Sequence, residues 1–285
     1  MVYLNGEFLS AGDAKVSVFD GAWLHGAGLF ETMRAENGRV FRLQAHLERL
    51  RRSAERLLQP LERKSLPSVE ACEELLRRNG LDSARLRLTV SAGSMLERLD
   101  SANDRPLTVC MTAQALIGHP AQAYESGIQV AICPFLISPT DPIVQHKTTS
   151  YLPRLLGLRE AQRARCIEAL WFTTRHHLAE GSISNVFLAS KGILQTPPLD
   201  TPVLPGITRA VVLELARRLK IETRECELTI HDLLDADEVF LTNAIMQLMP
   251  VVRVEKSEIA GARVGDIART LMRAYRDLVK EECGG

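Results

Sequence analysis

The chain contains two informative segments, Gln145-His146-Lys147-Thr148-Thr149-Ser150-Tyr151 and Ala179-Glu180-Gly181-Ser182-Ile183-Ser184-Asn185-Val186-Phe187. The first places Lys147 in an otherwise uncharged stretch, and the second places the acid Glu180 just before an expected strand. A lysine amine forms an imine with an aldehyde cofactor, and a carboxylate can hold a pyridine nitrogen in its protonated form. Taken singly, either residue is more often a solvated surface charge, so the surrounding sequence has to decide.

Length and composition indicate a globular protein with room for two hydrophobic cores. The chain has 285 residues, of which 46% are hydrophobic and 25% are charged, and domains typically contain about 100–150 residues. Its 35 basic and 35 acidic residues cancel to a formal net charge of +0. Because a nucleic-acid-binding protein needs an excess of basic residues to neutralise phosphates, we expect no nucleic-acid partner.

The cysteines and the apolar segments predict where the protein resides. Its 6 cysteines are scattered, without a C-x-x-C pair or a histidine at zinc-binding spacing. This pattern indicates free thiols in a reducing compartment and no metal site. No apolar run approaches the roughly 20 residues of a membrane helix, and the first residues lack the regions of a signal peptide. We therefore expect a cytoplasmic protein without a membrane partner.

The pattern of apolar residues predicts an α+β first half. Asn5-Gly6 is typical of a two-residue β-hairpin turn. Helical spacing predicts helices over 43–58 and 69–78, and strand-like runs occupy 85–90 and 107–111.

A break in the periodicity around Gly118-His119-Pro120 separates this half from the rest. We predict an N-terminal α+β domain over 1–115, a linker over 116–126 and a C-terminal domain over 127–285. The lysine segment is expected to begin a helix that reaches about Arg165. The other expected elements are strands at 128–133, within 167–194, and near 221–228, 239–242 and 251–254, with helices from Pro205 and Val264.

Two features suit the binding of a phosphate group. Gly206-Ile207-Thr208 begins a predicted helix, whose free N–H groups and dipole favour an anion, and the Thr208 hydroxyl could add a further bond. Arg49, in the helix predicted over 43–58, could pair with the same phosphate through its planar fork. Taken alone, the first is more often an ordinary helix start and the second a solvated arginine.

A resemblance to a known family rests on several ordered motifs. They are Phe19-Asp20-Gly21 with Gly26-Ala27-Gly28-Leu29-Phe30-Glu31-Thr32, His46-Leu47-Glu48-Arg49-Leu50, Lys147-Thr148-Thr149-Ser150-Tyr151, Glu180-Gly181-Ser182-Ile183-Ser184-Asn185-Val186-Phe187 and Gly206-Ile207-Thr208-Arg209. With these motifs the chain resembles the class IV (fold type IV) pyridoxal-phosphate enzymes. That family includes branched-chain aminotransferases, D-amino-acid aminotransferases and aminodeoxychorismate lyases. The resemblance covers nearly the whole chain, from Tyr3 to Val251.

The resemblance implies a cofactor, pyridoxal 5'-phosphate, and a role for each matching residue. Lys147 matches the lysine that binds the cofactor as an imine and moves the proton at the substrate carbon. Glu180 matches the carboxylate that faces the pyridine nitrogen and keeps the ring cationic. Phe30 matches an aromatic position that lines the substrate pocket. The residues that match phosphate contacts are Arg49, Ile207, Thr208, Asn243 and Ala244.

The same resemblance implies a fold and an assembly. The expected fold is α+β or α/β, with the two domains of a fold-type-IV enzyme such as D-amino-acid aminotransferase. The N-terminal α/β domain would be the smaller one, and the C-terminal domain a larger pseudo-barrel. Because the active site of the family lies between the two domains and at a homodimer interface, a homodimer is implied.

Two segments bear on the subclass. Thr242-Asn243-Ala244 has a Thr-Asn-small pattern similar to that of the lyases, whereas the aminotransferases usually carry other Thr/Gly/Ser-rich combinations there. Ser91-Ala92-Gly93 stands where D-amino-acid aminotransferases have an arginine that binds the substrate carboxylate, which Ala92 cannot do. Ala92 is therefore a candidate residue of the substrate pocket, and the D-amino-acid interpretation is weakened.

A substrate carboxylate needs another donor. Arg85 and Arg87 alternate with leucines on a predicted strand and share one face of it. We predict Arg87 for this role, with a solvent-exposed arginine as the alternative. His25 is expected to make a structural hydrogen bond, and Asp20 is expected to be a turn residue.

Three functional hypotheses result. The leading one is a 4-amino-4-deoxychorismate lyase, which forms 4-aminobenzoate and pyruvate for folate biosynthesis. The alternative is an aminotransferase that moves an amino group between a branched-chain or D-amino acid, or an amine, and a 2-keto acid. The third is a non-enzymatic binding or structural relative, which the joint presence of Lys147, Glu180, Arg49 and Thr208 argues against.

Overall fold

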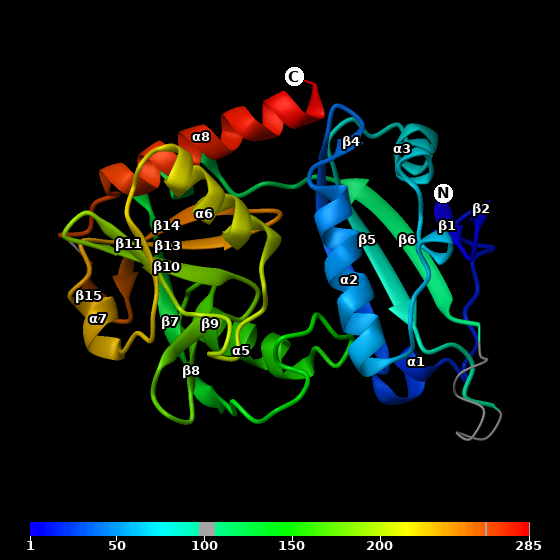
Figure 1. The fold of residues 1–285 in the computed structure, drawn as a ribbon, viewed down its shortest axis with the longest axis horizontal. Helices are drawn as coiled ribbons and strands as arrows, with labels where there is room; N and C mark the ends of the chain where they lie inside the picture. The colour runs from blue at the N-terminus through cyan, green and yellow to red at the C-terminus, as the bar shows by residue number, and fades with distance from the viewer. Residues whose placement is uncertain (97–105, 260, 285) are drawn as a thin grey trace. The chain divides into compact units, whose positions relative to one another are not determined.

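The computed structural model describes residues 1–96, 106–259 and 261–284, and the chain divides into two compact units. Unit 1 comprises Met1–Ile117, His146–Tyr151 and Val279–Gly285, and unit 2 comprises Gly118–Gln145 and Leu152–Leu278. Figure 1 labels the elements of both. In the described part of the chain, no helix is long and apolar enough to cross a membrane.

Unit 1 is built on a six-stranded antiparallel sheet with the strand order β2-β1-β6-β5-β3-β4. Its elements are β1 (Val2–Leu4), β2 (Glu7–Leu9), α1 (Gly21–His25), β3 (Gly28–Glu36), β4 (Arg39–Val40), α2 (Leu43–Leu57), the 3-10 turn η1 (Arg63–Ser65), α3 (Val69–Arg78), β5 (Ala84–Ser91) and β6 (Thr108–Ala115). The pairing of Leu4 with Glu7 confirms the predicted two-residue hairpin at Asn5-Gly6.

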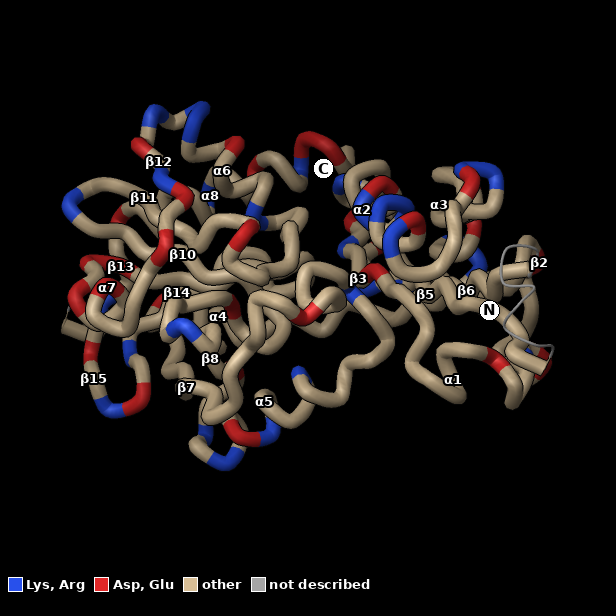
Figure 2. The backbone as a smooth tube through the Cα atoms, turned by 60° about the horizontal axis from the view of Figure 1, so that its bottom comes forward, with Lys and Arg blue, Asp and Glu red and all other residues tan. Residues whose placement is uncertain are grey.

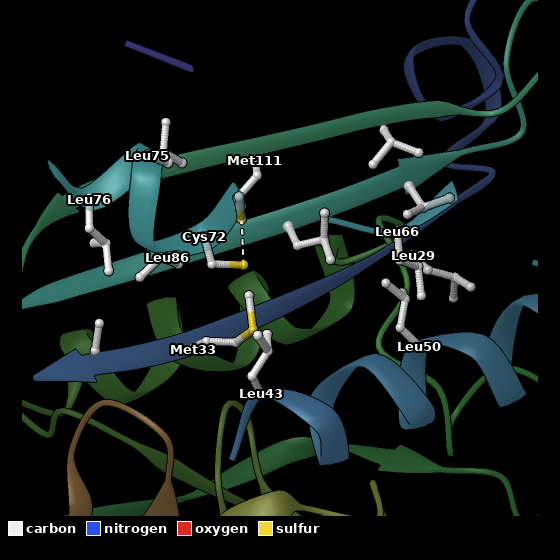
Figure 3. Close-up of a cluster of buried hydrophobic side chains, with 14 of the residues drawn as sticks. Leu29, Met33, Leu43, Leu50, Leu66, Cys72, Leu75, Leu76, Leu86 and Met111 are labelled. Carbon is white, nitrogen blue, oxygen red and sulfur yellow. Dashed lines mark hydrogen bonds between the residues drawn. The ribbon is translucent and has the colours of Figure 1, made fainter. Parts of the chain in front are cut away.

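The core of unit 1 forms where α2 and α3 pack against the sheet. Strand alternation places Leu29 and Met33 of β3 in this core, together with Leu86 of β5. Leu43 and Leu50 of α2 enter it from the helix, as Figure 3 shows. Burying each such side chain contributes about 1.5–3 kcal/mol, so the sheet face and the helices stabilise one another.

The helices of unit 1 begin and end where their residues allow. Ser68 caps the first turn of α3 through its hydroxyl, and Gly80 after the helix adopts a φ of +63° that suits glycine. The predicted range of α3 is confirmed, and α2 ends one residue before its predicted end. Charges of both signs alternate on α2 (Figure 2), where Glu48 pairs with Arg51 at 3.0 Å. These partly exposed pairs are worth little each, so the buried face holds the helix in place.

Unit 2 is built on a nine-stranded mixed sheet. Its order is β12-β11-β10-β13-β14-β7-β8-β9, and β15 pairs with β14 beside that path. The elements are α4 (Ala121–Ser126), β7 (Ile128–Ile137), α5 (Leu152–Arg163), β8 (Ala169–Thr173), β9 (Leu178–Gly181), β10 (Asn185–Ser190), β11 (Ile193–Thr196), α6 (Ile207–Arg218), β12 (Thr223–Glu225), α7 (Ile230–Leu234), β13 (Glu238–Asn243), β14 (Gln247–Val254) and β15 (Ser257–Glu258). The last helix, α8 (Asp266–Cys283), has its final residues grouped with unit 1.

The central strands of unit 2 are buried on both faces. β10 and β13 are nearly continuous apolar runs, as expected for strands covered on both sides. Phe187 of β10 stacks on Phe240 of β13 with ring centres 5.1 Å apart. The buried strands β10 and β13 therefore fix the positions of the turns at both ends of β10.

The lysine segment is extended, so the prediction that it begins a helix is wrong. The carbonyl of Lys147 accepts a hydrogen bond from Phe30 N at 2.8 Å, and Thr149 N donates to the carbonyl of Gly28 at 2.8 Å. The backbone groups of Gly28 and Phe30 in β3 need hydrogen-bond partners on the edge that does not pair with β5, and the extended lysine segment provides them. Helix α5 begins only at Leu152.

The described units differ from the predicted division into 1–115, 116–126 and 127–285. The segment His146–Tyr151 is grouped with unit 1, in keeping with its hydrogen bonds to β3. Part of the predicted linker forms the helix α4. As a statement about independently folding domains, the predicted division stays a prediction.

Candidate active site

In unit 1, Lys147 lies beside two aromatic rings. Its Nζ is 4.7 Å from the centre of the Phe30 ring and 5.7 Å from the centre of the Tyr151 ring. The two rings meet edge to face, with their centres 5.1 Å apart. Aromatic walls exclude water from the neighbourhood of an amine and attract it only through their faces. This environment suits a lysine that acts as a nucleophile.

Arg87 contacts the same Phe30 ring. Its guanidinium carbon is 3.8 Å from the centre of the Phe30 ring. Burial, reinforced by the neighbouring Arg85, lowers the pKa of Arg87 from its ordinary value. Its Cα partner on β3 is Thr32, and no ion pair joins Arg87 to a carboxylate among the described residues. A half-buried guanidinium against the Phe30 ring can receive an anionic group.

The buried residues Glu31 and His46 form a cluster with the mostly buried Arg49, and the sequence predicted it only in part. Glu31 of β3 accepts hydrogen bonds from Arg49 Nε at 2.8 Å and Arg49 Nη2 at 2.5 Å. His46 Nδ1 lies 2.7 Å from Glu31 Oε2. Arg49, predicted as a phosphate contact, is therefore held in a fork by a carboxylate of its own unit. Its contact with a phosphate stays a prediction.

The charges of this cluster depend on one another. Burial by itself would raise the pKa of Glu31, but the charge of Arg49 and the hydrogen bond from His46 outweigh it and lower the pKa to about 2. Burial lowers the pKa of His46, although Glu31 opposes this effect. An ionised carboxylate only accepts hydrogen bonds, so His46 Nδ1 carries the proton that it donates to Glu31. The cluster is thus an Arg⁺–Glu⁻ pair with a hydrogen-bonded imidazole.

The alternation of side chains along β3 could have indicated that Glu31 is buried. Leu29, Glu31 and Met33 alternate onto the same buried face, so one acid interrupts an apolar series. His46 and Arg49 are three residues apart and share one face of α2. A buried acid opposite such a pair predicts an ion-pair cluster.

In unit 2, Glu180 at the end of β9 is almost completely buried and fully engaged. Its Oε2 accepts hydrogen bonds from Leu204 N at 2.9 Å and from Asn185 Nδ2 at 3.3 Å. Its Oε1 accepts a hydrogen bond from Arg154 Nη2 at 2.5 Å. Arg154 lies 26 residues before Glu180 in the chain, so no local sequence signal predicts this contact.

A second buried acid, Glu168, holds the loop that follows Glu180. Its two oxygens accept hydrogen bonds from Ala169 N and Ser182 N at 2.9 Å, Ile183 N at 3.1 Å and Ser184 Oγ at 2.8 Å. Burial raises the pKa of Glu168, and these donors oppose that rise. The carboxylate therefore sets the path of the backbone between β9 and β10.

Helix α6 begins with an uncapped turn. Its N-cap residue, Gly206, has no side chain that could bond the first N–H groups. A Cβ at Gly206 would lie 1.9 Å from Asn185 Oδ1, so no larger residue fits there. Ile207 and the buried Thr208 form the first turn, whose N–H groups point toward any anion at this end of the helix.

The loop after β13 is held by Asn243. Its Oδ1 accepts hydrogen bonds from Ile245 N at 2.9 Å and Met246 N at 2.8 Å, and its Nδ2 donates to the carbonyl of Ile183 at 3.2 Å. Asn243 thus ties two loops of unit 2 together, while Ala244 lies in the turn. The predicted phosphate contacts of Asn243 and Ala244 stay predictions.

The segment Ser91-Ala92-Gly93 has a structural explanation. Asp20 caps α1 through Ala22 N at 2.9 Å and also accepts a hydrogen bond from the Ser91 hydroxyl. Gly93 has a φ of +73°, and a Cβ there would lie 2.1 Å from the carbonyl oxygen of Pro106. The turn residue Asp20 is therefore a buried helix cap, whereas His25, expected to make a structural bond, is exposed.

The groups in the two units fit the chemistry of pyridoxal phosphate. Unit 1 offers the Lys147 amine against aromatic rings. Unit 2 offers the buried carboxylate of Glu180 and the uncapped start of α6. In addition, Thr242 Oγ1 is buried with no hydrogen-bond partner in the described part of the chain, on the strand that pairs with Asn185. An unpaired buried hydroxyl costs free energy, which a bound polar group can offset.

Comparisons with known proteins show the family of the chain. The family model for amino-transferase class IV matches residues 28–254. A Methanocaldococcus jannaschii protein, provisionally named a branched-chain-amino-acid aminotransferase, is 36% identical over 281 residues, which cover 97% of this chain and 96% of that protein. The aminodeoxychorismate lyase of Bacillus subtilis is 30% identical, with 98% of this chain and 95% of the lyase covered.

A solved structure shares the fold. The T.th. branched-chain amino acid aminotransferase with pyridoxamine 5'-phosphate superposes with a TM-score of 0.88 at 27% identity, covering 98% of this chain and 93% of that one. The chain therefore belongs to the class IV aminotransferase family, has its fold-type-IV architecture, and uses pyridoxal phosphate as its cofactor.

Proposed function

We propose that this protein is an aminotransferase that moves the amino group between an amino acid with a branched aliphatic side chain and a 2-oxo acid. The names of most of the similar proteins support this proposal over the lyase. The observation that carries it is the arrangement in unit 1, where the guanidinium of Arg87 and the amine of Lys147 contact the same Phe30 ring. In this proposal Arg87 binds the substrate carboxylate, and Lys147 acts at the α-carbon next to it.

The cofactor, when bound, supplies an aldehyde carbon that takes up amino groups and a pyridine ring that withdraws electrons from the substrate α-carbon. Lys147 holds the cofactor between turnovers and moves the proton at the α-carbon as general base and acid. Phe30 and Tyr151 lie against this amine and limit the access of water to it. In unit 2, Glu180 orients the ring nitrogen and balances its charge.

The half-reaction with a single amino acid tests the proposal. The purified protein, loaded with cofactor, is mixed with L-leucine, L-isoleucine or L-valine in the absence of any 2-oxo acid. We expect the absorbance of the lysine-bound cofactor to be replaced by that of pyridoxamine phosphate, because the amino group has been transferred. D-alanine serves as the comparison donor. A spectrum that a broad panel of L- and D-amino acids leaves unchanged would sink the proposal.

Arg87→Met is predicted to raise the KM for the amino acid by roughly 10–100-fold, because a charged hydrogen bond to the carboxylate contributes about 1.5–3 kcal/mol. Methionine retains apolar contact with Phe30, so the sheet should stay folded. Steady-state kinetics with L-leucine measure the change. Arg85→Met is the matched control on the same strand, since Arg85 is exposed, and its KM should stay close to that of the unaltered protein. Equal KM values for both variants would remove Arg87 from this role.

A 4-amino-4-deoxychorismate lyase is the second candidate function. Its support is the Thr242-Asn243-Ala244 segment together with the similarity to the Bacillus subtilis lyase. The two segments that bear on the subclass also have structural roles here, since Asn243 holds a turn and Ser91 bonds the helix cap Asp20. They therefore carry less weight for the subclass. Formation of 4-aminobenzoate and pyruvate from 4-amino-4-deoxychorismate would favour the lyase.

We also infer a homodimer. Unit 1 exposes the apolar side chains of Val18, Phe19, Trp23 and Leu24 in and before α1, and 76% of Trp23 is accessible. Monomeric proteins rarely leave several large apolar side chains exposed together. Light scattering on the purified protein would give the mass of the assembly directly.

A further inference from the structure

Arg154 binds the carboxylate of Glu180 from the first turn of α5. Its Nη2 donates to Glu180 Oε1 at 2.5 Å, and its Nη1 donates to the carbonyl of Gly181 at 3.4 Å. The guanidinium carbon lies 5.1 Å from the centre of the Trp171 ring. We propose that Arg154 is a positioning residue that keeps Glu180 ionised and oriented toward the cofactor's ring nitrogen. This inference rests on the cofactor role proposed for Glu180.

The backbone of α5 is shaped for this contact. Gly157, one turn after Arg154, is buried, and a Cβ there would lie 2.7 Å from the Trp171 ring and 2.8 Å from Ser182 Oγ. Only glycine lets the helix approach β8 and the Glu180 loop this closely. Trp171 is fixed in turn by the hydrogen bond from its Nε1 to Ser182 Oγ at 2.9 Å. The guanidinium is therefore held on two sides by rigid groups.

A guanidinium at this position has a defined electrostatic effect. The side chains of Glu180 and Arg154 are 5% and 16% exposed, so their interaction is weakly screened. The positive charge disfavours a proton on the carboxylate more than one on the ring nitrogen, because the guanidinium contacts the carboxylate directly. Asn185 and Leu204 N occupy the other oxygen but carry no charge. Arg154 is thus a charged partner that favours the anionic form of the acceptor.

The other titratable groups around the pair do not replace Arg154. Glu168 faces the loop after Glu180, and burial raises its pKa. Cys133 of β7 has its pKa raised by burial, while the charge of Arg154 lowers it and those of Glu160 and Glu168 raise it. Both glutamates favour protonation of a neighbouring acid. Arg154 opposes the effect of these acidic groups on Cys133, and its direct contact with Glu180 opposes protonation there as well.

The experiment compares Arg154→Met, Arg154→Lys and Glu180→Gln, the double variant Arg154→Met/Glu180→Gln, and the control Arg159→Met. Arg159 is an exposed arginine on the same helix. Two properties are measured from about pH 9 to about pH 6: the affinity of each apoprotein for pyridoxal phosphate and the midpoint of thermal unfolding of the apoprotein. Neither measurement depends on turnover, and the second needs no cofactor.

We expect Arg154→Met to raise the dissociation constant for the cofactor about tenfold or more, and to do so increasingly as the pH falls, because the unpaired carboxylate takes up a proton. Arg154→Met should lower the midpoint temperature of thermal unfolding of the apoprotein most at high pH, where the carboxylate of Glu180 is ionised. Arg154→Lys should recover most of both effects, since it restores the charge. In the Glu180→Gln background, Arg154→Met should change the dissociation constant by less than about threefold, and Arg159→Met should have no effect.

Two results would overturn the inference. One is an Arg154→Met protein whose cofactor affinity and pH profile match those of the unaltered chain. The other is an equal loss on Arg154→Met with and without Glu180, which would make Arg154 a packing residue only. If Arg154→Met does not fold, Arg154→Lys measured against Glu180→Gln still decides between these outcomes. A failure of the proposed function differs from both, because the unaltered protein would then bind the cofactor without taking up the amino group of L-leucine, L-isoleucine or L-valine.

Discussion

Lys147→Ala is expected to lower the rate of amino-group transfer by about 10⁴-fold or more, because the variant loses both the amine that holds the cofactor and the base that moves the substrate proton. The fold should remain, since the segment is attached to β3 through the backbone of Lys147 and Thr149, not through the lysine side chain. Half-reaction spectra and steady-state rates with L-leucine measure the loss, and circular dichroism measures the fold.

The control for this prediction is a lysine outside the site. Lys256 is exposed in a turn of unit 2, and Lys256→Ala should transfer amino groups at the normal rate. Borohydride reduction of the unaltered holoenzyme, followed by peptide mapping, should place the cofactor on the peptide that contains Lys147. Retained activity in Lys147→Ala, or a label on another peptide, would contradict the role given to this residue.

The second large effect is expected for Glu31. Glu31→Gln should reduce the free energy of unfolding by roughly 3–5 kcal/mol, because it leaves the guanidinium of Arg49 buried without its counter-charge. The amide also has one acceptor oxygen where the carboxylate has two, so the fork from Arg49 and the bond from His46 can no longer both be satisfied. Urea unfolding followed by circular dichroism measures the change.

The pH dependence of stability follows from the same cluster. Folding lowers the pKa of Glu31 from 4.5 to about 2, so its contribution of roughly 3 kcal/mol is fully present above about pH 4.5 and is lost as the pH falls toward 2. Burial also lowers the pKa of His46 from 6.5, so the unfolded state gains protons first as the pH falls below that value. Both groups therefore weaken the fold in acid, and Glu31→Gln should flatten this dependence.

Glu48 provides the matched control for Glu31. It lies on α2 and pairs with Arg51 and Arg52, but 34% of its side chain is accessible to solvent. Because water replaces the lost partner on the surface, Glu48→Gln should change the stability very little. If Glu31→Gln were no more destabilising than Glu48→Gln, the buried cluster would not stabilise unit 1.

Local features of the fold could be predicted because they depend on neighbours in the sequence. The hairpin at Asn5-Gly6 and the range of α3, Val69–Arg78, follow from turn chemistry and from a serine cap. The failure at Lys147 has the opposite cause. The backbone groups of this segment pair with β3, more than a hundred residues earlier in the chain, as the bond from Phe30 N to the carbonyl of Lys147 shows. No window of local sequence contains that partner.

The site residues divide in the same way. The sequence by itself determined the family and the cofactor and gave Lys147 and Glu180 as candidate site residues, because motif order along the chain reports a shared fold and shared chemistry. Only the tertiary structure decided what surrounds them: the Phe30 ring that both Lys147 and Arg87 contact, the buried Glu31 bound by Arg49, and the guanidinium of Arg154 on Glu180. The physical reason is that the charge state and orientation of a buried group depend on contacts made through space, between residues that sequence spacing does not relate.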